Sequence, residues 1–345
     1  MEVNNYFLLF ANCQIVKGSK HHIIVDLLHE RYKQIPAPVI ELIDTLKENR
    51  ISSVIEGFNT KEKQKTIDFI QYLVDNEWGH LTTKPEFYPD LTKQPFSNPR
   101  TLNNAILDLD HTSDYDLCRA LKEIDKVGIY AVQIRVYNQI EEKKFLKTLS
   151  YTKNLNTKYI QVLIPFTDYL DSQKELEAVL SENLQIREVI ISNSNRKEVY
   201  YNEESDLGII RYIEEEIGSC EQCGQISKWS FSPNQQHFLE AQEFNTCLNG
   251  KVSVDVDGNI KNCPSMTQSF GKVGSTNIQE VVNTQGFRTL WTINKDQISE
   301  CQDCEFRYIC TDCRAYITDG NDKFSKPAKC AYDPYEGTWK KEKSC

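Results

Sequence analysis

The sequence lacks several features that would place the protein in a common functional class. No stretch of its 345 residues approaches the ~18 consecutive apolar residues of a membrane-spanning helix. Its formal net charge is −10, so acidic residues outnumber basic ones, which argues against a nucleic-acid-binding surface. It contains no Gly-x-x-x-x-Gly-Lys phosphate loop, so no motif marks it as an NTPase. We therefore expect no nucleic acid and no membrane among its partners.

The first residues also lack the pattern of a secretory signal peptide. They carry no basic leader, and their apolar run is very short. We therefore expect a cytoplasmic protein whose thiols stay reduced. Hydrophobic content is 39% and charged content 26%, which is ordinary for a globular protein with a packed core. The length predicts two or three domains.

Cysteine is scarce in the first 219 residues, where only Cys13 and Cys118 occur, and abundant after them. Ten of the 12 cysteines follow, and four of these form two Cys-x-x-Cys pairs separated by five residues. In a reducing compartment this spacing favours metal ligation over disulfides. Soft thiolates select zinc, Cu(I) or iron–sulfur clusters, and spacing alone does not separate them. The nine candidate ligands are Cys220, Cys223, Cys247, Cys263, Cys301, Cys304, Cys310, Cys313 and Cys330.

Residues 1–83 predict a compact winged-helix module. Two β-prone runs, Tyr6–Val16 and His22–Leu28, predict a hairpin. Apolar residues at helical spacing then predict three helices, which we expect around residues 39–46, over 52–56 and over 60–76. Thr60 is the expected N-cap of the third helix, and Trp78–Leu81 begins a β wing. Residues 84–102 contain four prolines in polar sequence and predict a linker.

Residues 103–219 alternate between strand and helix patterns, which predicts βαβ units and a parallel sheet. The expected strands are Ala105–Leu109, Ala131–Tyr137, Tyr159–Ile164 and Glu188–Ser192. The expected helices are Asp114–Val127, Glu141–Lys153, Gln173–Asn183 and one around Arg211–Ile217. Four such units are too few for an eight-fold barrel, so we expect a partial barrel or an open sheet.

Residues 220–345 form the cysteine-rich segment. Val252–Lys261 alternates between apolar and polar residues and contains Asp257-Gly258, a strong hairpin signal. Cys247 precedes this hairpin and Cys263 follows it, so both thiols should return to the same end of one β-ribbon.

Seven of these cysteines and one glycine follow a specific order. The series is Cys247, Gly258, Cys263, Cys301-x-x-Cys304-x5-Cys310-x-x-Cys313 and Cys330. It closely resembles the SPASM domain, the cluster-binding C-terminal extension of many radical SAM peptide-modifying enzymes. The resemblance covers about a quarter of the chain. It departs from the family at the last spacing, where three residues are usual and this chain has two, Thr311 and Asp312.

The sequence around these cysteines is similar to one subgroup, the SPASM-domain maturases of grasp-with-spasm systems. The similar stretches are Cys247–Asp255, Asn259–Met266, Cys304–Tyr316 and Ser325–Cys330. The resemblance implies two partners, an ATP-grasp ligase and a short ribosomal precursor peptide. It also implies that residues 1–83 are a PqqD-like peptide-recognition module, 103–219 a degenerate radical-SAM-like barrel and 220–345 a SPASM-like domain.

SPASM domains hold two auxiliary 4Fe-4S clusters with interleaved ligands, and the resemblance implies the same arrangement here. One cluster would be held by Cys301, Cys304, Cys310 and Cys330, and the other by Cys247, Cys263 and Cys313. The motif does not specify the fourth ligand of the second cluster. Cys223 or Cys220 is expected, because both directly precede the domain. Zinc in these sites is the alternative.

Radical SAM enzymes need a Cys-x-x-x-Cys-x-x-Cys triplet after the first barrel strand. The corresponding stretch, Leu109–Arg119, contains only Cys118, and the triplet occurs nowhere in the chain. We therefore expect radical chemistry to be absent and Cys118 to be a small core residue. The same stretch begins a polar loop with four titratable residues, Asp108, Asp110, His111 and Asp114. They could bind a cation or act as acid and base, but a helix-capping loop with Asp114 as the cap is favoured.

Three functions are consistent with these patterns. The first is a non-catalytic partner in ribosomal-peptide maturation of the graspetide type, which binds the precursor and carries iron–sulfur clusters. The second is a redox-active iron–sulfur enzyme or electron carrier. The third is a zinc-stabilised interaction scaffold. Whether the protein is an enzyme stays open at this level, and the missing triplet favours a non-catalytic partner.

Overall fold

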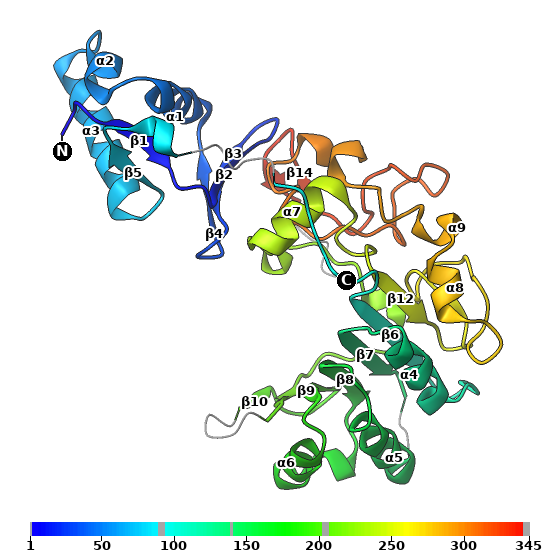
Figure 1. Ribbon diagram of the computed structural model, residues 1–345. Coiled ribbons are helices and arrows are strands. Elements are labelled where there is room, and N and C mark those ends of the chain that lie inside the picture. The colour runs from blue at the N-terminus through cyan, green and yellow to red at the C-terminus, as the bar shows by residue number, and fades with distance from the viewer. Residues whose placement is uncertain (1, 89–93, 139–140, 202–206, 341–345) are drawn as a thin grey trace.

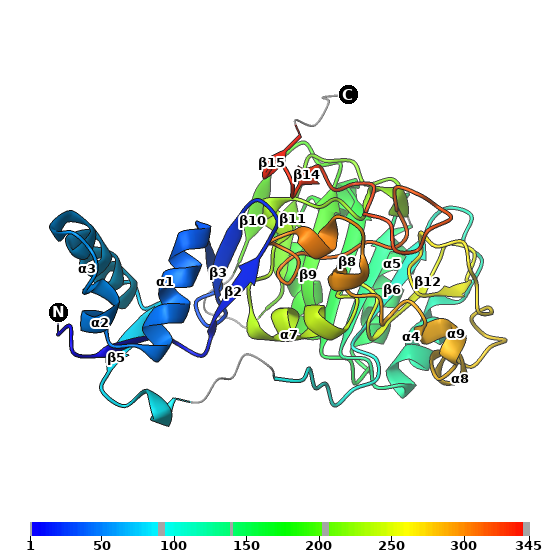
Figure 2. The ribbon, with the colours of Figure 1, turned by 90° about the horizontal axis from the view of Figure 1, so that it is seen from above.

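The chain is a mixed α/β protein with three regions arranged along its length. The computed structural model describes residues 2–88, 94–138, 141–201 and 207–340. The N-terminal module lies at one end and the large sheet at the other, and the cysteine-rich segment lies between them (Figures 1 and 2).

The N-terminal module contains two small antiparallel sheets. Its strands are β1 (Tyr6–Leu9), β2 (Cys13–Lys17), β3 (His22–Asp26), β4 (Arg31–Ile35) and β5 (Gly79–Thr82). The predicted hairpin is present as β2 and β3, and β4 extends it to three strands. The first predicted strand is in fact two, because β1 leaves the hairpin and pairs with β5. We did not predict β4 from the sequence, because Arg-Tyr-Lys-Gln-Ile is mostly polar and does not alternate between apolar and polar residues as a half-buried strand does.

Three helices pack on these strands as the apolar spacing predicted: α1 (Ala37–Glu48), α2 (Ile51–Ile55) and α3 (Thr60–Asp75). Their inward residues, among them Ile43, Leu46 and Ile70, share a core with Phe7 and Trp78. The predicted cap of α3 was wrong by one residue. Asn59 accepts from the Glu62 backbone N–H, and the Glu62 side chain accepts from the Asn59 N–H, which completes a capping box.

The central region is an open, mainly parallel sheet. Its eight strands lie in the order β10-β11-β9-β8-β7-β6-β12-β13. Their bounds are β6 (Asn104–Leu109), β7 (Ala131–Val136), β8 (Tyr159–Pro165), β9 (Ile186–Ser192), β10 (Glu198–Tyr200), β11 (Ile209–Tyr212), β12 (Lys251–Val254) and β13 (Ile260–Lys261). The four predicted strands are confirmed as β6 to β9, which pair in parallel.

Three helices cover one side of this sheet, α4 (Leu117–Lys126), α5 (Glu142–Thr152) and α6 (Gln173–Glu182) (Figure 1). All three were predicted. The fourth predicted helix, around Arg211–Ile217, was wrong, because this segment begins with β11, which pairs in parallel with β9. Ile210 and Tyr212 both face the core, the alternation of a strand rather than of a helix.

The cysteine-rich segment completes the sheet and adds short elements. The hairpin predicted around Asp257-Gly258 is present as β12 and β13, and Gly258 has a φ of 77°. β12 pairs in parallel with β6, so one sheet crosses the boundary predicted at residue 219. The remaining elements are α7 (Gln235–Glu243), α8 (Ile278–Val282), α9 (Gln285–Arg288), β14 (Tyr332–Asp333) and β15 (Thr338–Trp339).

The predicted linker, residues 84–102, is partly described. Residues 89–93 lie outside the described residues, and the described remainder contains one short 3-10 turn, Pro85–Phe87. Phe96 anchors it to the cysteine-rich segment, because its N–H donates to Glu243 Oε1 over 2.8 Å and its ring contacts Phe244. Across the described parts of the chain, no helix combines the length and the apolarity needed to cross a membrane.

The three-stranded sheet of the N-terminal module packs against the cysteine-rich segment. Val16, Ile23 and Val25 are buried in one cluster with Phe306 and Ile309. Hydrogen bonds border this apolar contact: Ser19 N–H donates to the Asp303 carbonyl over 2.7 Å, and Arg307 Nη1 to the Lys17 carbonyl over 2.7 Å. The module is therefore joined to the thiol-bearing loops by a packed core.

This interface should contribute strongly to stability. Ile23→Ala should lower the free energy of unfolding by about 2–5 kcal/mol, because Ile23 is fully buried and its loss leaves a cavity. The matched control is Leu28→Ala, just beyond the same strand, where the side chain is 70% exposed and the change should be within about 0.5 kcal/mol. Denaturant unfolding of the full chain measures both, and equal effects would contradict the packed interface.

Candidate metal centres

Eleven cysteines lie in the described parts of the chain, and all of them are free thiols. Four predicted ligands interact electrostatically with one another and form the C-terminal thiol set, Cys301, Cys304, Cys310 and Cys330. Burial raises the pKa of Cys310 to about 11, and the thiols of Cys330 and Cys301 add to this rise. Burial also raises the pKa of Cys304, to which Cys310 and Cys301 contribute.

A second group, the hairpin thiol set, comprises Cys223, Cys247, Cys263 and Cys313. Cys247 precedes β12 and Cys263 follows β13, at the same end of the ribbon. Burial raises the pKa of Cys263 to about 11, and the thiols of Cys247 and Cys223 add to the rise. The chain crosses between the two sets within three residues, since Cys310 belongs to one and Cys313 to the other.

Cys220 and Cys223 precede the hairpin in the chain and lie beside its thiols through contacts made by neighbouring residues. The Gly224 backbone, at a φ of 85°, packs so closely on Cys313 that a Cβ there would lie 2.9 Å from its Sγ. Lys329 Nζ donates to the Cys223 carbonyl over 2.8 Å, and Ser265 Oγ donates to the Cys220 carbonyl over 3.1 Å. Cys223 itself is exposed, whereas Cys263 and Cys313 are buried.

The geometry of metal coordination is not established by these positions. Among the described side chains, no group of three or more His, Cys, Asp or Glu residues is arranged so that it could hold a metal ion. The thiols of each set lie within electrostatic range of one another, but their assignment as ligands stays a prediction.

A lysine ammonium lies beside each thiol set. Lys295 Nζ is 3.6 Å from Cys310 Sγ, and the side chain is almost fully buried. Lys251 Nζ donates to Cys247 Sγ over 3.3 Å. Burial acts to lower the pKa of Lys251, but the thiols of Cys247 and Cys263 raise it above its ordinary value. Lys295 acts to lower the pKa of Cys310, and Lys251 that of Cys263, but burial outweighs both lysines and keeps the two pKa values raised. In donor chemistry, although not in the arrangement of the described side chains, groups of four cysteines are what thiolate-ligated clusters require.

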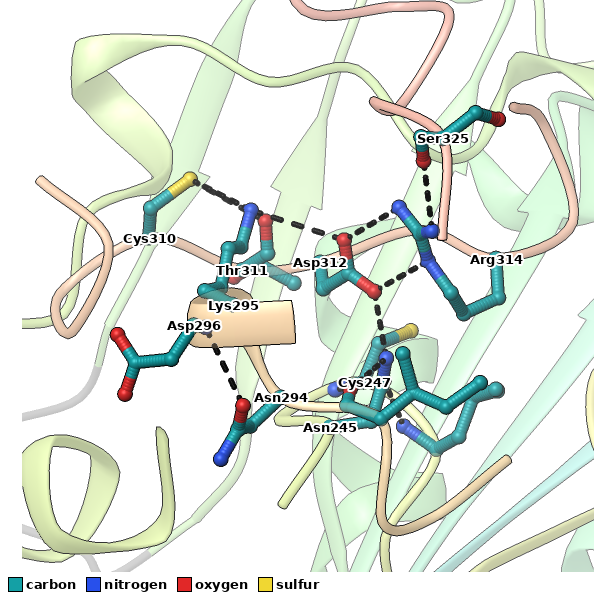
Figure 3. A network of polar contacts seen from close by, with 12 residues as sticks. Asn245, Cys247, Asn294, Lys295, Asp296, Cys310, Thr311, Asp312, Arg314 and Ser325 are labelled. Carbon is teal, nitrogen blue, oxygen red and sulfur yellow. Dashed lines mark hydrogen bonds and ion pairs between the residues drawn. The ribbon is translucent and has the colours of Figure 1, made fainter. Parts of the chain in front are cut away.

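A buried carboxylate, Asp312, lies between the two thiol sets (Figure 3). Arg314 forms an ion pair with it, with Nε 2.6 Å from Oδ2 and Nη2 2.9 Å from Oδ1. Lys295 Nζ is 3.6 Å from Oδ1 on the side of Cys310. On the other side Asn245 Nδ2 donates to Oδ2 over 2.5 Å, and Asn245 Oδ1 accepts from the Cys247 N–H over 3.1 Å.

A second buried network lies at the carboxyl ends of β6 and β7. Arg135 Nε and Nη2 donate to Asp108 Oδ1 and Oδ2 over 2.6 and 2.8 Å, and the Tyr137 hydroxyl donates to Oδ2 over 2.9 Å. Burial raises the pKa of Asp108, although Arg135 acts to lower it. Arg135 also interacts electrostatically with Cys223, and Tyr137 with Cys220. The edge of the sheet and the hairpin thiol set are therefore adjacent.

The four titratable residues predicted after the first strand do not form one site. Asp108 lies within β6 and is bound by Arg135, whereas Asp110 accepts from the Thr112 N–H and hydroxyl over 2.7 and 2.6 Å. His111 contacts the side chain of Asn138 instead. The predicted cap was also wrong, because Asp116 and not Asp114 accepts from the Arg119 N–H that begins α4.

Cys118 was expected in the core but is only half-buried, one residue from the inward Leu117 on α4. A histidine of the β wing, His80, stacks its ring on Phe10, contacts Tyr88 and has both nitrogens buried. Burial lowers its pKa.

Sequence reasoning missed the charged residues around the thiols. Lys251, Lys295 and Asp312 are ordinary polar residues by composition, and nothing in their spacing predicts burial. One signal was available for Asp312, since it lies inside the Cys-x-x-Cys step that was shorter than the family pattern. Arg135 stood within a predicted strand of apolar residues, where a charge needs a partner, and Asp108 on the neighbouring strand is that partner.

The Asp108–Arg135 pair provides a stability test of this region. Arg135→Met should cost about 3–5 kcal/mol in the free energy of unfolding, because it leaves a buried carboxylate without its cation. The double variant Asp108→Leu/Arg135→Met should recover most of that loss. Arg211→Met is the matched control on β11, where the ion pair with Glu188 is half-exposed and is worth at most about 1 kcal/mol. Denaturant unfolding distinguishes these outcomes; a double variant as unstable as Arg135→Met would contradict the interpretation.

Comparison with known proteins yields only distant structural similarity. No protein-family model matches the sequence, and no curated protein does. Streptococcus suis SuiB bound to S-adenosylmethionine aligns at 10% identity and a TM-score of 0.30, over 90% of this chain and 96% of that chain. SuiB bound to the precursor peptide SuiA aligns at 10% identity and a TM-score of 0.32, over 93% and 98%. At these TM-scores a common fold is not established.

Proposed function

We propose that this protein is a component of a ribosomal-peptide maturation system of the graspetide type. It binds the precursor peptide, works with an ATP-grasp ligase in the cytoplasm and carries two cysteine-ligated 4Fe-4S clusters. The proposal places it with the SPASM-domain maturases of grasp-with-spasm systems, as a partner that does not generate radicals.

The observation that carries this proposal is the ordered series of cysteines, with one lysine ammonium 3.6 Å from Cys310 Sγ and another 3.3 Å from Cys247 Sγ. We assign Cys301, Cys304, Cys310 and Cys330 to one cluster and Cys247, Cys263 and Cys313 to the other, an assignment that the mutual electrostatic contributions of these thiols support. This is the crossed order implied by the resemblance of the sequence to SPASM domains. Cys223 is the better candidate for the eighth ligand, because its thiol interacts with that of Cys263.

The residues of the chain prepare both sites for a metal cluster. The C-terminal thiol set would hold one cluster and the hairpin thiol set the other; when bound, such clusters supply one-electron redox chemistry. The chain buries four of the eight thiols, Cys263, Cys301, Cys310 and Cys313, and places Lys295 beside one set and Lys251 beside the other. Because the segment has few regular elements, metal binding would also contribute free energy to its folding.

The N-terminal module is proposed as the peptide-binding part. Three helices, a three-stranded sheet and the β1–β5 pair support a winged-helix, PqqD-like module. Its three-stranded sheet packs on the cysteine-rich segment near Cys310, so a bound peptide would lie on the same body as the thiol sets.

The absence of radical chemistry rests on the sequence. The loop that should carry three cysteines contains Cys118 alone. In the structure this loop is closed by its own hydrogen bonds, in which Asp110 accepts from Thr112 and the Tyr115 hydroxyl donates to the Asp108 carbonyl. Anaerobic incubation with S-adenosylmethionine and reductant should therefore yield no 5′-deoxyadenosine.

Metal content tests the cluster assignment directly. Protein purified without oxygen should be brown and contain about eight irons and eight sulfides per chain for two 4Fe-4S clusters. Cys263→Ser and Cys330→Ser should each remove about half of the iron, because they break different sets, whereas Cys118→Ser should remove none. Colourless protein with stoichiometric zinc would instead favour the zinc-stabilised scaffold.

Peptide binding is tested best on the intact chain, since removing residues 1–83 would uncover the apolar cluster around Phe306. Hydrogen exchange with and without the precursor peptide from the same gene cluster should show protection within β2 to β4 and α1 to α3. A scrambled peptide of the same composition is the control. Protection confined to residues 103–219 would contradict the assignment.

A further inference from the structure

A single buried carboxylate is shared by the two thiol sets. Asp312 is 2% exposed and lies in the two-residue step between Cys310 and Cys313, where the chain passes from one set to the other. The other residue between Cys310 and Cys313 is Thr311, which carries no charge. The position therefore places one negative charge beside both candidate centres.

Polar contacts extend from Asp312 in both directions (Figure 3). Toward the C-terminal thiol set, Lys295 Nζ lies 3.6 Å from Asp312 Oδ1 and 3.6 Å from Cys310 Sγ. Toward the hairpin thiol set, Asn245 donates to Asp312 Oδ2 and accepts from the Cys247 N–H. A continuous chain of polar contacts thus joins the Cys310 thiol, through the carboxylate, to the backbone N–H of Cys247.

The electrostatics of the thiols agree with this geometry. Asp312 contributes to the raised pKa values of Cys301 and Cys310 in one set, and of Cys313 in the other, after burial as the main cause. The lysines near the two sets differ. Lys251 acts on the hairpin thiol set, and Lys326, held by Glu300 and the Tyr332 carbonyl, lies near Cys330 and Cys301.

We propose that Asp312 is a positioning residue common to both metal centres, whose buried negative charge sets the reduction potentials of the two clusters together. The inference rests on the proposed function, in that it takes the two thiol sets to be cluster sites. In a low-dielectric interior a unit charge a few ångströms from a redox centre opposes the addition of an electron. Losing Asp312 therefore makes both clusters easier to reduce, whereas losing a nearby lysine makes one cluster harder to reduce.

The test is an anaerobic redox titration of the full-length protein, followed by electron paramagnetic resonance. Asp312→Asn should raise both midpoint potentials. Each rise should correspond to a change on the order of tenfold in the equilibrium constant for reduction, which is 59 mV for a one-electron couple. Asp312→Glu, which keeps the charge, should restore most of both shifts. Lys251→Met should lower only one potential and Lys326→Met only the other. A shift of a single potential in Asp312→Asn would overturn the inference.

Asp312→Asn leaves Lys295 and Arg314 without their anion and could prevent folding, so a second variant is needed. Asn245→Ala keeps the ion pairs of Asp312 and removes its link to Cys247, together with the hydrogen bonds of Asn245 to the Ile293 carbonyl and the Leu248 N–H. It should move the potential of the hairpin centre, identified as the one that Cys263→Ser removes, and leave the other unchanged. If Asp312→Asn does not fold and Asn245→Ala moves neither potential, the inference is wrong.

Failure of the proposed function gives a different result. Protein that holds zinc and no iron refutes the cluster assignment, yet the shared carboxylate can still be tested by chelator competition. Asp312→Asn should then weaken zinc binding at both sites, and Lys251→Met should affect one. Weakening at a single site in Asp312→Asn would overturn the inference in that case as well.

Discussion

The cysteine-rich segment depends on a buried charge network centred on Asp312. Between β13 and β14 it has only short helical turns, so few backbone ladders hold its loops in place. Arg314 binds Asp312 and also donates to the Lys323 and Ser325 carbonyls, while Lys295 and Asn245 bring in two further loops. Burying these charges is costly unless all of them are paired, so the network specifies one arrangement of the loops and, with it, where the thiols lie.

The large sheet gives this segment a rigid base. β12 adds to β6 in parallel, which anchors Cys247 and Cys263 at one edge of the sheet through a hairpin. The Asp108–Arg135 pair lies on the adjoining inner strands, towards their carboxyl ends, and Arg135 interacts electrostatically with Cys223. On the opposite side the N-terminal module packs on Phe306 and Ile309, close to Cys310. The thiol sets are thus held between two packed cores, although the loops that bear them are irregular.

Much of the regular structure was predictable because it follows local patterns. Helices such as α1 and α4 show their apolar residues at helical spacing, and β6 to β9 are short runs of branched residues. The errors occurred where a long-range contact overrides the local pattern. Ile209–Tyr212 is a strand because β9 offers an edge to pair with, and Arg31–Ile35 is one because β3 does. The caps were displaced by one or two residues, since several polar residues compete at each helix start.

The sequence by itself determined the candidate metal ligands, the order of the thiols along the chain and the hairpin that joins Cys247 to Cys263. These depend on residue type and short spacing. Only the tertiary structure decided what surrounds the thiols: a lysine beside each set, Asp312 between them, and Cys223 next to Cys313 through the close approach of Gly224. The approach of Gly224 to Cys313 joins distant segments of the chain, and the charges of Lys251, Lys295 and Asp312 acquire strength only through burial, which no local pattern in the sequence specifies.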